Sequence, residues 1–229
     1  EEYWCSRWAT PIEQISRIRV MKSHLKNLRT RLKDFWRKYR NSSYFKRVNA
    51  SELSREIGAD TVPYIWAEAH LLYDKPDKIG VDDMSNMVHF GPRVMPLFES
   101  ARARLQIASP YFIPGASGSQ WMIDKTRSGV DFEVLTNSLA ATDVPAVHAG
   151  YKRYRKHLLA HGIRLYELTR DAVSRTSRSE RIIRHRPRAS LHAKYIIIDK
   201  KIVLTGSANI DPRSSNLNTE IAVVIESEQ

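Results

Sequence analysis

Residues 191–211 carry polar side chains at spacings that could bind and attack a phosphodiester. The segment reads LHAKYIIIDKKIVLTGSANID. His192 and Lys194 are two residues apart in a run typical of a strand, so both side chains should leave the same face. A second apolar run leads to Ser207 and Asn209, which are again two residues apart. We expect a hairpin that places an imidazole, an ammonium, a hydroxyl and an amide around one small site.

These groups suit phosphoryl transfer. Negative charge grows on the equatorial oxygens of a phosphodiester during attack, and Lys194 and Asn209 could supply a charge and N–H donors there. A neutral histidine could attack the phosphorus while a second one protonates the departing alcohol. An attacking histidine needs its other ring nitrogen held by a carboxylate. Glu220, on the next expected strand, is the candidate for that role, and Gly206 would let the backbone approach a ligand.

Metal binding is a poorer interpretation of the same segment. No second histidine or acid stands at a ligand spacing from His192, as in H-x-x-x-H. Lys194 would also repel a cation. We therefore expect no metal and no cofactor.

The surrounding sequence alternates between strand and helix patterns. This alternation predicts an α/β layered domain with a mixed, largely parallel sheet flanked by helices. Helices are expected at 93–104, 119–127 and 144–161. Strands are expected at 105–109, 131–136, 163–168, 191–198, 201–205 and 220–225.

The N-terminal part differs from the rest. Residues 11–40 show apolar positions at helical spacing, with ten Lys or Arg and one acid, Asp34, between positions 17 and 40. Two interpretations stay open: the apolar stripe packs on the core, or a surface helix meets anionic lipid. Residues 64–73 read as a buried strand or a short helix. The charged, proline-containing run at 74–78 then predicts a boundary near 76–90.

The net charge of +12 comes from 37 Lys and Arg against 25 Asp and Glu. It favours polyanionic partners, either nucleic acid or an anionic membrane face, over a merely soluble basic protein. No run of 18 apolar residues exists, and the first ten residues lack the apolar core of a signal peptide. With no starting Met, a processed product or a fragment is expected. Cys5 is the sole cysteine, which excludes an intrachain disulfide.

An arginine-rich run at residues 175–188 has no regular spacing of apolar residues. The sequence leaves open whether this run binds substrate or forms a mobile loop. Its arginines are Arg175, Arg178, Arg181, Arg184, Arg186 and Arg188.

The spacing His-x-Lys-(x)4-Asp-(x)6-Gly-Ser-x-Asn, which includes Asp199, is similar to the signature of the phospholipase D superfamily. Residues 89–115, with SPYFIPG, and 135–168 resemble the second catalytic half of bacterial cardiolipin synthases. Residues 214–227 resemble the stretch that follows the motif. EYWCS at 2–6 resembles the aromatic run that usually follows the first motif of such enzymes.

The resemblance implies a domain organisation. Residues 89–229 would form a second phospholipase D-like catalytic half, and residues 1–88 the helical tail of a first half plus a linker. The family normally has two motifs. Only His24 begins another H-x-K, and Arg31 stands where its aspartate should be. We therefore expect a fragment that works with a missing N-terminal catalytic half or with a second copy of the chain.

The function implied by the resemblance is a phosphatidyltransferase of cardiolipin synthase type, acting through a phosphohistidine. Its substrate would be an anionic phospholipid such as phosphatidylglycerol, at the cytoplasmic side of a bacterial inner membrane. His192 would act as general acid and then base. Lys194 and Asn209 would hold the phosphate with help from Ser207, and Asp199 would be structural. The alternatives are a homodimeric phosphodiesterase or nuclease acting on nucleic acid, and an incomplete site that only binds lipid.

Overall fold

The computed structural model describes residues 22–81, 87–169 and 190–228. The chain divides into two compact units, and the division falls between Trp66 and Ala67. Within the described part of the chain, no helix is both long and apolar enough to cross a membrane. The arginine-rich run at 175–188 and the opening ten residues lie outside the described residues.

The first unit is helical. Its described helices are α2 (Lys22–Arg40), α3 (Ser43–Asn49) and α4 (Glu52–Ala59). Ser42 and Ser51 cap α3 and α4 by accepting a hydrogen bond from a backbone N–H of the first turn. The helix expected over 11–40 is confirmed from residue 22 onward, and 11–21 are outside the described residues. The apolar side of α2 is more than half exposed at Leu28, Leu32, Phe35 and Trp36.

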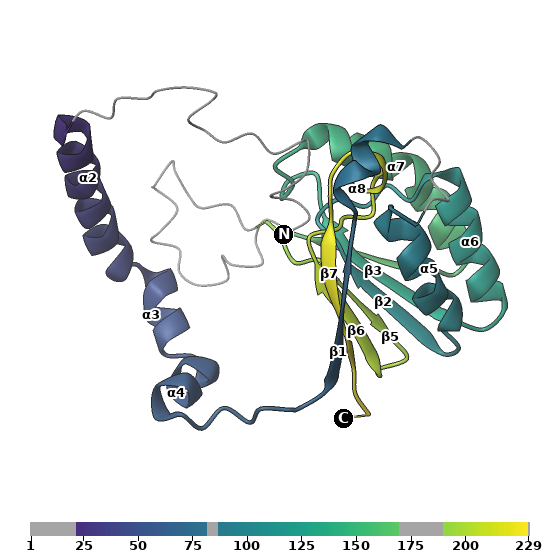
Figure 1. The fold of residues 1–229 in the computed structure, drawn as a ribbon, viewed down its shortest axis with the longest axis horizontal. Coiled ribbons are helices and arrows are strands. Elements are labelled where there is room, and N and C mark those ends of the chain that lie inside the picture. The colour runs from purple at the N-terminus through teal and green to yellow at the C-terminus, as the bar shows by residue number, and fades with distance from the viewer. Residues whose placement is uncertain (1–21, 82–86, 170–189, 229) are drawn as a thin grey trace. The chain divides into compact units, whose positions relative to one another are not determined.

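The second unit is built on a seven-stranded sheet with the order β1-β7-β6-β5-β2-β3-β4 (Figure 1). Its strands are β1 (Glu68–Tyr73), β2 (Arg104–Ala108), β3 (Asp131–Asn137), β4 (Arg164–Leu168), β5 (Tyr195–Ile198), β6 (Ile202–Gly206) and β7 (Ile221–Glu226). Its helices are η1 (Pro76–Gly80), α5 (Phe90–Ser100), α6 (Gly115–Arg127), α7 (Pro145–Ala160) and α8 (Pro212–Asn216).

The expected mixed sheet with flanking helices is confirmed, but parallel pairing does not predominate in it. Of the described strand pairs, only β2–β3 and β3–β4 are parallel, since α6 and α7 carry the chain back between these strands. The β5–β6 connection is instead a tight turn of three residues, 199–201, in which the N–H of Lys201 donates to the carbonyl oxygen of Ile198. Asp199 and Lys200 there have φ of 51° and 61°, as such hairpin turns require. β6, β7 and β1 follow antiparallel to one another.

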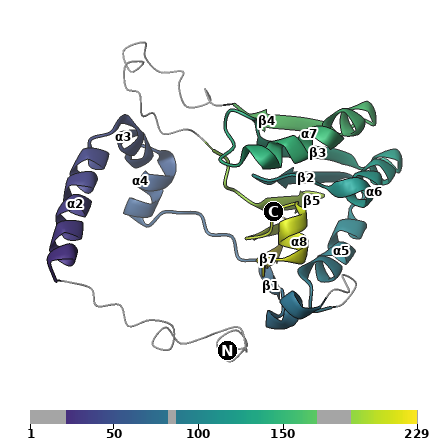
Figure 2. The same ribbon diagram turned by 90° about the horizontal axis from the view of Figure 1, so that it is seen from above.

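The core lies between one face of the sheet and helices α5, α6 and α7 (Figure 2). Alternate strand residues such as Ile107, Phe132 and Ile196 point into it, which is the period of two expected for strands. Val94 of α5 and Leu158 of α7 pack against them. One continuous hydrophobic cluster therefore fixes the strands that carry the candidate site.

The N-terminal edge of the sheet begins before the expected boundary. β1 pairs antiparallel with β7 from Glu68 to Tyr73. Most of this strand is exposed, so the strand expected within 64–73 is present but is not buried. Residues 67–81 thus form part of the sheet unit, whereas the family resemblance implied a tail and linker there.

Candidate active site

The expected hairpin forms, and it brings the Gly-Ser-Ala-Asn loop beside Lys194. The N–H of Gly206 donates to the carbonyl oxygen of Lys194 at 3.2 Å. A Cβ at position 206 would lie 2.1 Å from the carbonyl oxygen of Ile221 and 2.6 Å from the Cα of Ala222. Only glycine fits at this close backbone approach. A side chain there would separate β6 from β7 and displace Ser207.

His192 and Lys194 precede the regular strand instead of lying on it, because β5 begins at Tyr195. Their backbone is held by a side chain. The N–H of Leu191 donates to Asn137 Oδ1 at 2.8 Å, and Asn137 Nδ2 donates to the Leu191 carbonyl oxygen at 3.1 Å. Lys194 Nζ donates to the His192 carbonyl oxygen at 3.0 Å. His192 is exposed and Lys194 is half-buried.

Glu220 is buried and bonds to the motif loop. Its carboxylate accepts a hydrogen bond from Ser207 Oγ at 2.5 Å, and the N–H of Ile221 donates to the same hydroxyl at 3.0 Å. Among the described residues, no hydrogen bond joins Glu220 to His192. The structure therefore shows Glu220 positioning Ser207, whereas the sequence pattern suggested that it orients a histidine.

Asn209 enters the site from the same loop. Its backbone N–H donates to Ser214 Oγ at 3.1 Å. Its side-chain Oδ1 is buried and has no hydrogen-bond partner among the described residues. An unpaired buried acceptor is unfavourable, so Asn209 Oδ1 is available to accept a hydrogen bond from a donor group of a ligand.

A buried ion pair holds the segment that connects these residues. Lys78 Nζ donates to Asp74 Oδ2 at 2.7 Å, and both side chains are completely buried. The same ammonium donates to the carbonyl oxygens of Ser214 and Asn218, at 2.9 and 2.7 Å. The N–H of Glu220 donates to Asp74 at 2.8 Å. The pair thus supports the segment that carries Ser214 and Glu220, a role that the sequence analysis missed.

Asp199 lies at the opposite end of β5 from His192 and Lys194. Its carboxylate accepts hydrogen bonds from the backbone N–H groups of Arg102, Ala103 and Arg104 at 2.7 to 2.9 Å. Partial burial acts to raise the pKa of Asp199, but these three hydrogen bonds outweigh it and hold the pKa below its usual value. Asp199 therefore fastens the β5–β6 turn to the start of β2.

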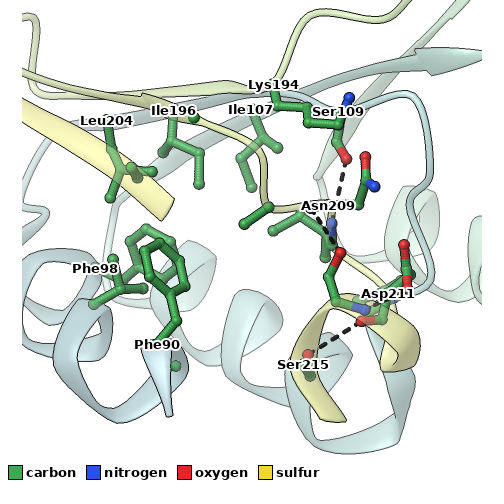
Figure 3. Close-up of a pocket in the computed structure, with 18 of the residues that line it drawn as sticks. Phe90, Phe98, Ile107, Ser109, Lys194, Ile196, Leu204, Asn209, Asp211 and Ser215 are labelled. Atoms are coloured by element: carbon green, nitrogen blue, oxygen red, sulfur yellow. Dashed lines mark hydrogen bonds between the residues drawn. The ribbon is translucent and has the colours of Figure 1, made fainter. Parts of the chain in front are cut away.

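A pocket of about 380 Å³ adjoins Lys194 and Asn209 (Figure 3). Strand residues such as Ile107, Ile196 and Leu204 line one wall, and Phe90 and Phe98 of α5 line the facing wall. Figure 3 shows these apolar residues at one end of the pocket and Asn209, Asp211 and Ser215 at the other. The pocket is therefore amphipathic, with its polar end at the motif.

Comparison with known proteins agrees with the motif. Residues 94–229 match the family model described as cardiolipin synthase, PLD-like domain. Cardiolipin synthase C of Escherichia coli (strain K12) is 37% identical over 227 residues, which are 99% of this chain and 47% of that protein. A cardiolipin synthase of Halalkalibacterium halodurans is 30% identical over 125 residues, 55% of this chain and 21% of that protein.

Among solved structures, Nuc of Salmonella typhimurium, a phospholipase D family member, is similar with a TM-score of 0.47 and 18% identity. That likeness covers 71% of this chain and 84% of Nuc. The chain spans less than half the length of the cardiolipin synthases that it matches. The family model covers more than half of this chain and includes the whole motif, so the chain belongs to the cardiolipin synthase family of phospholipase D-like domains.

Proposed function

We propose that this chain supplies one half of the active site of a phosphatidyltransferase of cardiolipin synthase type. The observation that carries this proposal is the assembly of the motif loop beside Lys194, at the polar end of an otherwise apolar pocket. A phosphate with an apolar substituent fits such a site. Phosphatidylglycerol is the substrate that we propose, because its phosphodiester is anionic and its body is apolar.

In the proposed reaction, Lys194 and Asn209 bind the equatorial oxygens of the phosphodiester and stabilise the charge that develops on them. A histidine from a second motif attacks the phosphorus, so a P–N bond forms as the P–O bond to the leaving alcohol breaks. His192 donates its proton to the leaving oxygen. The alcohol of a second phospholipid then attacks the phosphorus. Neutral His192 takes the proton of this alcohol while the P–N bond breaks.

The attacking histidine has to come from outside the site that this chain forms. One imidazole cannot lie in line behind the phosphorus and also beside the leaving oxygen. Of the other described histidines, His89 and His148 are buried, His157 lies on α7 and His161 caps its C-terminus, His70 pairs with Glu68 on β1, and His24 lies in α2 of the helical unit. We propose that an N-terminal catalytic half supplies the second histidine. The alternative supplier is a second copy of this chain, related by a twofold axis.

The proposed location is the cytoplasmic side of a bacterial inner membrane, where the protein would bind as a peripheral protein. The net charge of +12 favours an anionic lipid surface. Helix α2 presents basic residues beside its exposed apolar residues, as interfacial helices do.

The second candidate function is a homodimeric phosphodiesterase or nuclease, and the same net charge favours it. The apolar pocket favours the lipid substrate, because nucleic-acid binding relies on cationic grooves and aromatic stacking. The two functions differ in their requirement for an acyl chain.

The test compares this chain alone with the full-length protein that contains it. Each is assayed on phosphatidylglycerol vesicles and on bis(p-nitrophenyl) phosphate, and its mass in solution is measured. We expect an inactive chain and a full-length protein that forms cardiolipin and glycerol. Turnover by a strict monomer of this chain would refute the two-histidine mechanism. Turnover of the soluble diester by a dimer, without lipid transfer, would favour the nuclease-like alternative.

A further inference from the structure

The pocket beside the motif has a size and a lining suited to a chain of methylene groups. Its volume of about 380 Å³ lies within the range of roughly 300–1,000 Å³ typical of small-molecule sites. Leu204 and Ile196 on the sheet face Phe90 and Phe98 on α5 across the pocket (Figure 3). Filling this space with apolar atoms would remove both the ligand and these walls from water.

Apart from Asn209, whose Oδ1 has no partner among the described residues, the buried polar residues that line the pocket form hydrogen bonds within the protein. Asp211 accepts from the N–H groups of Arg213 and Ser214, where it caps α8. Ser214 Oγ accepts from the N–H of Asn209. Ser109 Oγ donates to the Tyr111 carbonyl oxygen. These groups already have hydrogen-bond partners and gain none from a polar ligand. The base of a nucleotide would lose its hydrogen bonds to water on entering the pocket, without replacing them.

We propose that the pocket holds the first part of one acyl chain of the lipid whose phosphate is bound at Lys194 and Asn209. This inference rests on the proposed function and deepens it, since it assigns recognition of the acyl chain to core-facing residues of this protein. The phosphate stays at the polar end. The attached apolar chain extends between α5 and the strand residues Ile196 and Leu204.

Two positions on α5 allow the pocket to be narrowed with little disturbance. Gly91 and Met95 line it one helical turn apart, and both are exposed. A Cβ at Gly91 would meet nothing within 4 Å. Gly91→Phe should therefore place a ring in open space at the pocket wall, and Met95→Trp adds bulk from the next turn. Gly91→Ala is the matched control, because it changes the backbone preference alone.

The experiment measures binding of inorganic phosphate and of ethyl, butyl, hexyl and octyl phosphate to this chain by calorimetry, below any micelle concentration. Headgroup charge is constant along the alkyl phosphates, so the change in affinity with alkyl-chain length measures the contribution of the pocket. Burial of a methylene contributes about 0.8 kcal/mol, so we expect affinity to rise about fourfold per added carbon until the pocket is full.

In Gly91→Phe and Met95→Trp the gain in affinity per added carbon should fall to near zero. Gly91→Ala should keep this gain, and inorganic phosphate should bind to all variants with the same affinity. Circular dichroism confirms that the variants fold. Wild-type affinities independent of chain length would overturn the inference, and so would failure of octyl phosphate to bind. A gain per added carbon that survives both bulky substitutions would also overturn it. If affinity rises with chain length as expected but the full-length protein does not turn over phosphatidylglycerol, the proposed function is refuted and the inference that the pocket binds an alkyl chain is retained.

Discussion

Asn137 holds the backbone of Leu191, the residue before His192, by two hydrogen bonds of 2.8 and 3.1 Å. Asn137 is itself buried at the end of β3, and its Nδ2 also lies 3.4 Å from the Pro110 carbonyl oxygen. A side chain on a rigid parallel strand therefore positions a histidine that lies outside any strand. This contact makes the placement of His192 depend on the α/β core.

Replacing Asn137 should reduce turnover without removing the fold. Asn137→Asp keeps the acceptor for the Leu191 N–H but loses the donor to its carbonyl oxygen. A misplacement of a catalytic group by about 1 Å can lower the rate on the order of 100-fold. We therefore expect kcat of the full-length protein to fall by about 10- to 100-fold, with KM little changed. Asn41→Ala, an exposed change in the helical unit, is the control. Unchanged kcat in Asn137→Asp would contradict the positioning role.

His192→Ala and Lys194→Ala should each abolish nearly all transfer activity of the full-length protein. The first removes the proposed proton donor and the second the cation for the phosphate oxygens, and such groups typically contribute factors of about 100 to 10,000. The readout is cardiolipin formation from phosphatidylglycerol. His157→Ala, at an exposed position of α7, should retain full activity. Either site variant retaining most of the wild-type rate would remove the catalytic role of that residue.

Asp199→Asn should change the dependence of stability on acid pH. The pKa of Asp199 is lowered in the folded chain, so its ionised form stabilises the fold above the unfolded pKa of about 3.9. That contribution is lost as pH falls from about 4 through the folded pKa. Wild type should therefore lose stability faster than the variant there, by at most about 1.4 kcal/mol per pH unit.

Urea unfolding at pH 3 to 7 measures this difference. Asparagine also tolerates the left-handed backbone of position 199, so the variant keeps the turn conformation while it removes the charge and the acceptor for the Arg102 N–H. Parallel stability curves for the two proteins over that range would refute the proposed contribution of the carboxylate.

Lys78→Met should destabilise the sheet unit strongly. The change leaves the Asp74 carboxylate buried without the cation that lies 2.7 Å from it, and breaking a buried pair in this way costs about 3–5 kcal/mol. The double variant Lys78→Met, Asp74→Leu should cost less than the sum of the single changes. Lys201→Met, which breaks the exposed pair with Glu228, should change the unfolding free energy little. Additive single changes would contradict coupling between Lys78 and Asp74.

Binding to anionic vesicles should depend on salt and on the basic residues of α2. Each Lys or Arg near an anionic surface contributes roughly 1 kcal/mol, so replacing Arg29, Arg31 and Lys33 by Gln should weaken binding on the order of 100-fold. Vesicle sedimentation at 0.1 and 0.5 M salt measures this, since exposed charges are screened over about 10 Å at the lower value. Neutral vesicles are the control. Equal binding to neutral and anionic vesicles would contradict the prediction.

Much of the local structure follows from the sequence pattern. The alternation in DFEVLT predicts β3, and Gly162 after an amphipathic run predicts the end of α7 near Ala160. The spacing of the motif predicts a hairpin whose loop returns beside Lys194, and the Gly206 contact confirms this. These features depend on neighbours in sequence, where side-chain period and glycine conformation act directly.

The sequence by itself therefore determined the family, the hairpin and the residue types that we propose to face a phosphate. Only the tertiary structure decided that Asn137 holds Leu191, that Lys78 and Asp74 support the segment before Glu220, and that Glu220 bonds to Ser207. The contacts of Asn137 and Lys78 join residues far apart in the chain through side-chain hydrogen bonds to backbone groups, and the contact of Glu220 joins two side chains. The spacing of apolar residues along the sequence does not reveal such pairings, because a buried polar group can bond to any nearby partner. Only the folded core determines which partner is near.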